Sequence, residues 1–294
     1  MAKGIQVVPR LLALSVGLLL AAAPFAGASK PDADFIAAAL MKQEANAAPS
    51  LQVFYTAGYT WLCPDACANP QEVHYIRTPG ILFKKVKSGK TAIANGKWNS
   101  RVRYDRATGE LRRFNVLLNG RGSGTIYTLD TSFGFGDAPC PDPIALHLWP
   151  VGTLLKLIKQ GVVADAQEEI DGHACWRVDI PEMGMDENNA SKTRASWTIW
   201  VDPKIGFCPR RASRASKQLE TPQLIEFFDY KRIGKGVYFP MRVTVRQDAS
   251  SFGWECKVQK AVCRKPISAE DLAVTFPSGT SVGVPSENRY YTQP

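Results

Sequence analysis

Alternation of apolar and polar residues is the dominant pattern in this chain, and it is clearest between residues 197 and 201. Trp197, Ile199 and Val201 alternate with Thr198 and Trp200, which is the period-two pattern of a β-strand. Pro203 should end this strand, because proline lacks the N–H that a ladder needs. Gly206 then offers a position that tolerates positive φ in a hairpin loop. We expect residues 207–213 to return antiparallel, so this hairpin lies in the middle of a large antiparallel sheet.

The same alternation recurs along most of the chain and predicts consecutive antiparallel strands separated by turn residues. The predicted strands cover residues 51–61, 72–77, 81–87, 98–105, 111–118, 125–129, 174–180, 194–201, 207–213, 224–230, 237–247 and 254–262. A helix over residues 29–48, capped by Asp32 and ended by Pro49, precedes them. Residues 142–161 form short helical turns that are apolar on nearly every side. This segment must be covered on several sides, or it must lie across an apolar surface; we expect the first.

The first residues have the three parts of a secretory signal. Lys3 and Arg10 give a positive start, residues 11–23 are apolar, and Ala26-Gly27-Ala28 is a small-x-small cleavage site. The alternative is an uncleaved membrane anchor, although the apolar run is short for a membrane span. We predict a signal peptide over residues 1–28, cleaved after Ala28, which places the protein in the periplasm or outside the cell. Residues 29–284 should form one domain, followed by a loose tail over residues 285–294.

The amino-acid composition gives the chain a net positive charge. The 294 residues carry a formal charge of +9, with 45% hydrophobic residues. Nucleic acid is not expected as a partner of an exported chain, so the charge favours an anionic membrane, polysaccharide or cell-wall surface, or only a solvated basic face. Five arginines are candidates for one basic patch, because they point outward from a strand or follow the central hairpin: Arg101, Arg103, Arg210, Arg211 and Arg214.

The seven cysteines fit an oxidising compartment, and their odd number predicts structural disulfides plus one free thiol. Cys256 and Cys263 lie an odd number of residues apart in one predicted strand. In a regular strand they would face opposite sides and could not pair.

Motifs for catalysis are weak throughout. The three histidines, His74, His147 and His173, lack metal-ligand spacing. Gly89-Lys90-Thr91 resembles the end of a phosphate-binding loop, but Lys84 stands where the first glycine belongs. The glycines of residues 120–124 precede a strand, not the helix that a dinucleotide-binding loop or a nucleophile elbow needs. We therefore expect no enzyme activity, no cofactor and no metal, with a hydrolase of envelope material as the least favoured alternative.

Several segments resemble the LolA/LolB-like lipoprotein-carrier superfamily and its larger bacterial relatives. The resemblance rests on the helix that leads into Ser50-Leu51-Gln52-Val53, and on the strand and hairpin signals of residues 170–176, 200–207, 227–230, 237–240 and 275–282. It implies a mainly β (α+β) fold, a strongly curved, half-open antiparallel sheet (an incomplete barrel) covered by a few helices. It also implies a hydrophobic cavity for acyl chains, or a stress-sensing module of the sigma-factor-regulator type. The chain is longer and richer in cysteine than the standard carriers.

The resemblance leads to two functional hypotheses. In the first, the protein is an exported, non-enzymatic carrier whose partner is a lipid or an acylated protein. The cavity would be lined by one face of the first strand and by the apolar helical segment, through Val53, Tyr55, Tyr59, Trp61, Leu154, Leu155 and Ile158. In the second, the same sheet has a filled core and binds an envelope protein.

Overall fold

The computed structural model describes residues 29–47, 50–59, 71–78, 81–87, 99–105, 107–116, 122–128, 155, 157–184, 194–216, 221–248, 252–264 and 266–294. The predicted signal peptide and its cleavage site lie outside these residues and stay predictions. Within the described ranges, no helix is long and apolar enough to cross a membrane.

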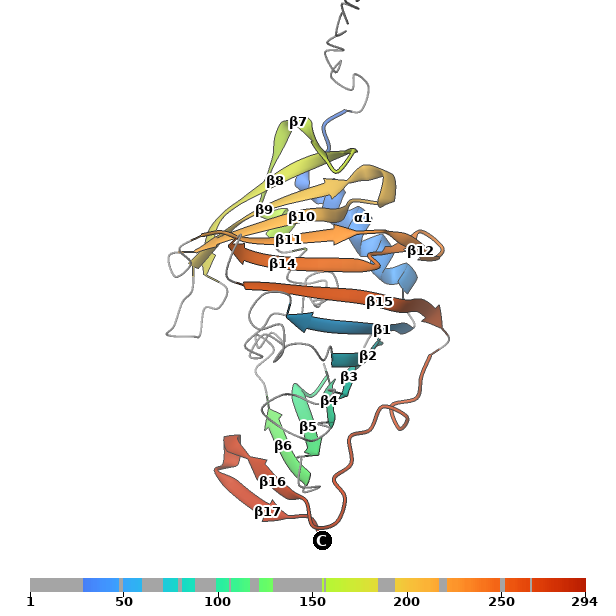
Figure 1. Cartoon of the computed structure of the whole chain (residues 1–294), viewed down its shortest axis with the longest axis vertical. Helices are drawn as coiled ribbons and strands as arrows, with labels where there is room; N and C mark the ends of the chain where they lie inside the picture. The colour runs from blue at the N-terminus through green and yellow to red at the C-terminus, as the bar shows by residue number, and fades with distance from the viewer. Residues whose placement is uncertain are drawn as a thin grey trace, which may run out of the picture.

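Fifteen strands form one sheet, in the order β17-β16-β6-β5-β4-β3-β2-β1-β15-β14-β11-β10-β9-β8-β7, and β12 and β13 form a separate hairpin. The sheet is curved and open, with β7 at one edge and β17 at the other (Figure 1). The first six strands are β1 (Ser50–Tyr59), β2 (Gln71–Arg77), β3 (Ile81–Lys87), β4 (Asn99–Asp105), β5 (Glu110–Val116) and β6 (Gly122–Thr128). The later strands are β7 (Val162–Ile170), β8 (His173–Gly184), β9 (Arg194–Asp202), β10 (Cys208–Ser216), β11 (Gln223–Phe228), β12 (Lys231–Gly234), β13 (Val237–Phe239), β14 (Arg242–Asp248), β15 (Phe252–Arg264), β16 (Ser281–Val284) and β17 (Arg289–Thr292). The expected fold class, a mainly β structure with a curved open sheet, is confirmed.

The central hairpin forms as the sequence predicts. Strand β9 ends at Asp202, and the 3₁₀ turn η2 (Pro203–Ile205) follows. The Asp202 carboxylate caps this turn by accepting a hydrogen bond from the Lys204 backbone N–H at 2.8 Å. Gly206 closes the turn with φ +69°, a left-handed conformation that glycine adopts without steric cost.

Helix α1 (Ala33–Ala47) covers one face of the sheet at the β8–β14 end (Figure 1). The Asp32 carboxylate accepts a hydrogen bond from the Phe35 N–H at 2.7 Å, which confirms the predicted cap. Ile36, Ala37 and Leu40 are buried against the sheet, whereas Phe35 is 60% exposed. We call the side of the sheet that carries these contacts the helix-covered face; Val53, Trp197, Ile199 and Val243 belong to its buried cluster.

A second buried cluster lies on the opposite side of the sheet, which we call the outer face, at the β2–β5 end. It contains Ile76, Phe83 and Phe114 from the strands, with Leu272 and Val274 from the C-terminal segment. The Ser268 hydroxyl accepts a hydrogen bond from the Asp271 N–H at 3.0 Å, which forms a capping turn at the start of this segment. The C-terminal segment therefore covers the outer face at the β2–β5 end, whereas α1 covers the opposite face at the other end of the sheet.

Three expectations about strands are corrected. The predicted strand over residues 237–247 is divided by Pro240, so β13 pairs with β12 and only β14 joins the large sheet. The segment after Pro285 is not loose, because β17 pairs with β16, and β16 pairs parallel with β6. Strand β7, which the alternation did not predict, forms the other edge.

The cysteines also differ from expectation. Among the described cysteines, Cys175, Cys208 and Cys263 are free thiols, so the expectation of a single free thiol is wrong. Cys256 and Cys263 both face the helix-covered side, opposite Ala57 and Leu51 of β1, because a bulge between them shifts the register of β15. Cys63, Cys67 and Cys140 lie outside the described residues.

Candidate functional site

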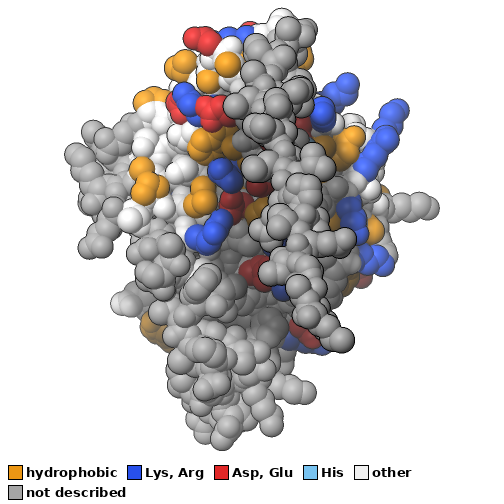
Figure 2. All heavy atoms as spheres, turned by 45° about the horizontal axis from the view of Figure 1, so that its top comes forward, with side chains coloured by type: hydrophobic (Ala, Val, Ile, Leu, Met, Phe, Trp, Pro, Cys, Tyr) orange, Lys and Arg blue, Asp and Glu red, His pale blue; other side chains and the backbone are white. Residues whose placement is uncertain are grey.

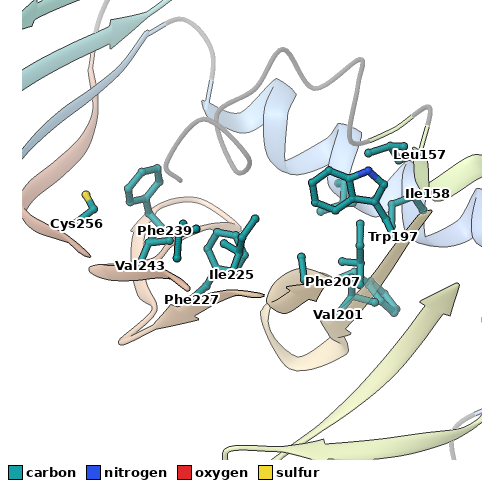
Figure 3. Close-up of a cluster of buried hydrophobic side chains, with 14 of the residues drawn as sticks. Leu157, Ile158, Trp197, Val201, Phe207, Ile225, Phe227, Phe239, Val243 and Cys256 are labelled. Atoms are coloured by element: carbon teal, nitrogen blue, oxygen red, sulfur yellow. The ribbon is translucent and has the colours of Figure 1, made fainter. Parts of the chain in front are cut away.

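The helix-covered face carries a continuous set of buried apolar side chains (Figure 3). They come from α1, from the strands between β3 and β7 in the order of the sheet, from β13, and from the short helical turn at residues 157–159. Phe239, Ile225 and Phe227 lie toward one end of the cluster in Figure 3, and Trp197 and Ile158 toward the other. This face is the largest apolar feature of the described chain, and we take it as the candidate site.

The residues predicted to line a cavity fall on this face where the structure describes them. Val53 and Ile158 are fully buried, Tyr55 is 2% exposed, and Leu155 is half-buried against the same cluster. Tyr59 lies in β1, but its side chain is outside the described set, as are Trp61 and Leu154. The structure therefore brings Val53, Tyr55, Leu155 and Ile158 to one cluster, and their role as a ligand cavity stays a prediction.

The helical turn around Ile158 packs tightly on β8. A side chain at Gly161 would bring its Cβ within 2.4 Å of Val178 Cγ1 and 3.1 Å of Ile180 Cγ1. Only glycine allows this close approach, which holds Leu157 and Ile158 against the sheet. The described end of the apolar segment is thus covered on its sheet side, whereas residues 142–154 lie outside the described residues and their expected cover stays a prediction.

Two polar side chains attach α1 to the strands beneath it. The Gln43 amide Nε2 donates to the carbonyls of Ile205 and Gly206 at 3.1 and 2.8 Å, and its Oε1 accepts from the Tyr238 N–H at 3.1 Å. Glu44 pairs with Arg77 of β2 at 2.5 Å. The helix is therefore held by a few directional contacts at one end in addition to its apolar face.

The structure does not bring the five candidate arginines together. Arg101 and Arg103 lie on β4, and the other three lie on β10, with β3, β2, β1, β15, β14 and β11 between them. Arg101 is exposed, and Arg103 pairs with Asp105 at 2.8 Å. On the side of the molecule shown in Figure 2, some Lys and Arg side chains lie beside Asp and Glu.

The three arginines of β10 have three different environments. Arg210, the extra residue of a β-bulge, is buried and donates from Nε and Nη2 to Asp202 Oδ2 at 3.1 and 2.9 Å. Arg211 pairs with Glu226 on the outer face at 2.9 Å. Arg214 instead lies opposite Trp197 on the helix-covered face, with its guanidinium carbon 5.8 Å from the centroid of the Trp197 ring system.

Nothing around the buried thiols suggests a nucleophile. Burial raises the pKa of Cys175 and of Cys208 to about 12. At neutral pH both are protonated and unreactive. The described residues also contain no group of three or more His, Cys, Asp or Glu side chains able to hold a metal ion.

Trp197 and Gln223, which are buried and pair with Arg214 on either side, were not predicted as site residues, and Arg214 was expected in a surface patch. The alternation predicted Trp197 on one face of its strand with Ile199 and Val201, and Arg214 is its direct cross-strand partner. The pairing register that joins the two could not be derived without knowing that a bulge occurs at Arg210.

Solved structures with the same architecture support the fold assignment. A DUF1329 family protein from Desulfovibrio piger matches with a TM-score of 0.52 and 9% identity over 83% of this chain and 100% of that one. A domain from Vibrio parahaemolyticus assigned to outer membrane lipoprotein sorting matches with a TM-score of 0.51 and 9% identity, over 82% and 97%. A LolA superfamily protein from Nitrosomonas europaea matches with a TM-score of 0.44 and 14% identity, over 84% and 99%. No protein-family model matches the sequence, and no curated protein is similar to it. At these identities the first two matches show that the fold is shared.

Proposed function

We propose that the protein is an exported, non-enzymatic carrier that binds a lipid or a protein-linked acyl chain on the helix-covered face. The observation that carries this proposal is the continuous apolar cluster of that face, which lies beneath a helix tied down by a few polar contacts. Each buried CH₂ group of an acyl chain contributes about 0.8 kcal/mol, so a chain of ordinary length has ample driving force to displace the helix or the turn.

The shared fold supports the same function. One protein of this fold is assigned to outer membrane lipoprotein sorting. In the part of the chain that the structure describes, the apolar face of this open sheet is covered by one helix, a short turn and the β12–β13 hairpin, and so small a cover can be exchanged for a ligand.

A second candidate, an interaction module with a filled core that binds an envelope protein, rests on a different observation. Val53, Tyr55 and Ile158 are at most 2% exposed, which is what a completed core requires. In that case the helix-covered face would stay closed, and the partner would bind elsewhere.

Native mass spectrometry of the protein purified from the envelope of its host tests the proposal. We expect a population whose mass exceeds that of the polypeptide by one lipid. A single lipid-free mass, together with no uptake of a fluorescent fatty acid by the purified protein, would favour the interaction module. The same spectrum measures the N-terminus: a mature chain that begins after Ala28 is expected, and a retained Met1 would contradict export with cleavage.

An anionic surface is the third partner that we propose, now restricted to the outer face around Arg101. Arg101 is exposed, and its cross-strand neighbour Lys85 adds a second positive charge. Binding to anionic vesicles should be weakened by salt and by Arg101→Glu, since exposed charges are screened within about 10 Å at 0.1 M salt. Equal binding to neutral vesicles would leave these residues as solvated surface.

A further inference from the structure

Two hydrogen-bond donors on the helix-covered face have no acceptor among the described residues. Trp197 is 4% exposed, and its indole Nε1 is buried without a hydrogen-bond partner. The Nε of Arg214, which lies opposite Trp197 on the neighbouring strand, is also buried and unpartnered. Buried polar groups in folded proteins are nearly always satisfied, so two adjacent exceptions require an explanation.

Arg214 differs from the arginines around it. Arg210 pairs with Asp202, Arg177 with Glu168 and Asp179, and Arg211 and Arg246 share Glu226. Within the described chain no carboxylate lies within ion-pair distance of Arg214, and burial alone lowers the pKa of its guanidinium. Because an arginine side chain stays protonated in proteins, it remains a partly desolvated cation without a counter-ion.

The register of the strands places this pair in a row of inward-facing residues. Ile180, Trp197, Arg214 and Gln223 are successive partners across β8, β9, β10 and β11. Gln223, 7% exposed, adds an amide to the row. The next row on the same face, Ile199, Ala212 and Ile225, is apolar and buried. A polar row thus borders the apolar cluster, and Trp197 lies beside Leu157 and Ile158 of the covering turn (Figure 3).

We propose that Arg214 and Trp197 bind the anionic head group of the ligand, a carboxylate or a phosphate, while its acyl chain lies on the adjacent apolar cluster. This inference rests on the proposed carrier function. An indole N–H and a guanidinium are donors only, so the group that satisfies both must be an acceptor, and the uncompensated charge selects an anion. Carboxylates and phosphates carry several acceptor oxygens and form charge-assisted hydrogen bonds with guanidinium. A neutral acylglycerol would leave the charge of Arg214 unpaired.

The test compares three probes with the same sixteen-carbon chain: palmitate, hexadecanol and hexadecyl phosphate. Each dissociation constant is measured at pH 8 by competition against a fluorescent fatty alcohol. The unmodified protein should bind palmitate at least about tenfold more tightly than hexadecanol, a difference of about 1.4 kcal/mol. Preference for hexadecyl phosphate over palmitate would identify a phospholipid-like head group, and the reverse order a free fatty acid.

The variants assign the preference to residues. Arg214→Gln should abolish the preference for the anionic probes and leave hexadecanol binding within about twofold, and Trp197→Phe should reduce the preference by a few-fold. The control is Arg246→Gln, which removes an arginine from the outer face of β14 and should keep the preference. Equal affinity of the unmodified protein for palmitate and hexadecanol would overturn this inference but not the carrier. If none of the three probes binds, both the head-group site and the carrier function are wrong. Equal loss of all three probes in Arg214→Gln would also overturn the head-group role, because the contribution of Arg214 would then not depend on the charge of the head group.

Discussion

Gln43 of α1 and Gly206 of the β9–β10 hairpin are joined by a hydrogen bond of 2.8 Å from the side-chain amide to the backbone carbonyl. A Cβ at Gly206 would lie 2.6 Å from the same amide nitrogen, and the residue has φ +69°. One glycine thus meets two requirements, the left-handed turn and the close approach of the helix.

Gly206→Ala should therefore lower the free energy of unfolding by more than the backbone strain at residue 206 alone would. The left-handed conformation costs a non-glycine residue about 1–2 kcal/mol, and loss of the Gln43 hydrogen bonds should add about 1–3 kcal/mol. Each kcal/mol lowers the Tm of a chain of this size by about 2–4 °C. Thermal unfolding measures the loss. The matched control is Gly172→Ala, where φ is +78° and an added Cβ would meet nothing within 4 Å.

The difference in Tm loss between Gly206→Ala and Gly172→Ala should disappear when both are made in a Gln43→Ala background. If Gly206→Ala and Gly172→Ala are equally unstable in the presence of Gln43, the amide does not hold the helix.

The buried ion pair between Arg210 and Asp202 should be critical for the hairpin. Arg210→Met keeps most of the side-chain volume but leaves the Asp202 carboxylate, 1% exposed, without its guanidinium. Breaking such a pair by removing one partner costs about 3–5 kcal/mol in the free energy of unfolding, which urea denaturation can measure.

The control for this variant is Arg177→Met. Arg177 is about 38% exposed and pairs with Asp179, itself 48% exposed, so its loss should cost at most about 1 kcal/mol. Similar losses for the two variants would mean that Asp202 is stabilised by its other contacts alone.

The strand pattern was predictable because local alternation records which face each residue presents. Trp197, Ile199 and Val201 were expected on one buried face and are at most 4% exposed. The proline and glycine positions of the hairpin likewise act locally, through their own backbone dihedral angles. Features of this kind need no knowledge of the partner strand.

What could not be predicted depends on pairing between distant segments. Strand β16 joins β6, with Ser281 opposite Ser123, and nothing local in either segment indicates the other. The bulges in β10 and β15 shift registers and reverse the side on which later residues lie. They decide that Cys263 faces inward and that Arg214 meets Trp197, so the candidate head-group site was outside the reach of the sequence alone.

The buried thiols predict a dependence of stability on alkaline pH. Burial raises the pKa of Cys175 and Cys208 from 9.0 to about 12, so the folded state keeps both protons where the unfolded state loses them. Their contribution to stability is complete below pH 9 and is lost as the pH rises toward 12. Between pH 7 and 8.5, iodoacetamide should leave both unmodified in the folded protein, as peptide mass spectrometry can show.

Cys263 is the comparison, since it is only partly buried and should react faster than either. Rapid modification of Cys208 in the folded protein at pH 8 would show that the contact between α1 and the hairpin opens readily.

The last prediction separates a ligand-binding face from a completed core, using Ile158 on the covering turn. Ile158 is fully buried, so Ile158→Ala should cost about 2–5 kcal/mol in the absence of ligand, and Ile158→Val about 0.5–1.5 kcal/mol. The carrier and the interaction module both predict this loss of stability. They differ in what lipid does, because a ligand that binds only the folded state raises the Tm.

In the carrier, a bound acyl chain takes the place of the covering turn. Palmitate should therefore raise the Tm of the unmodified protein, and Ile158→Ala should take up fluorescent fatty acid at least as well as the unmodified protein, since less side chain has to be displaced. Val53→Ala, on the sheet beneath, is the matched variant: it should weaken uptake, because the acyl chain loses a contact. If palmitate leaves the Tm of all three proteins unchanged and none takes up the fatty acid, the helix-covered face is a filled core, and the protein acts through its outer surface.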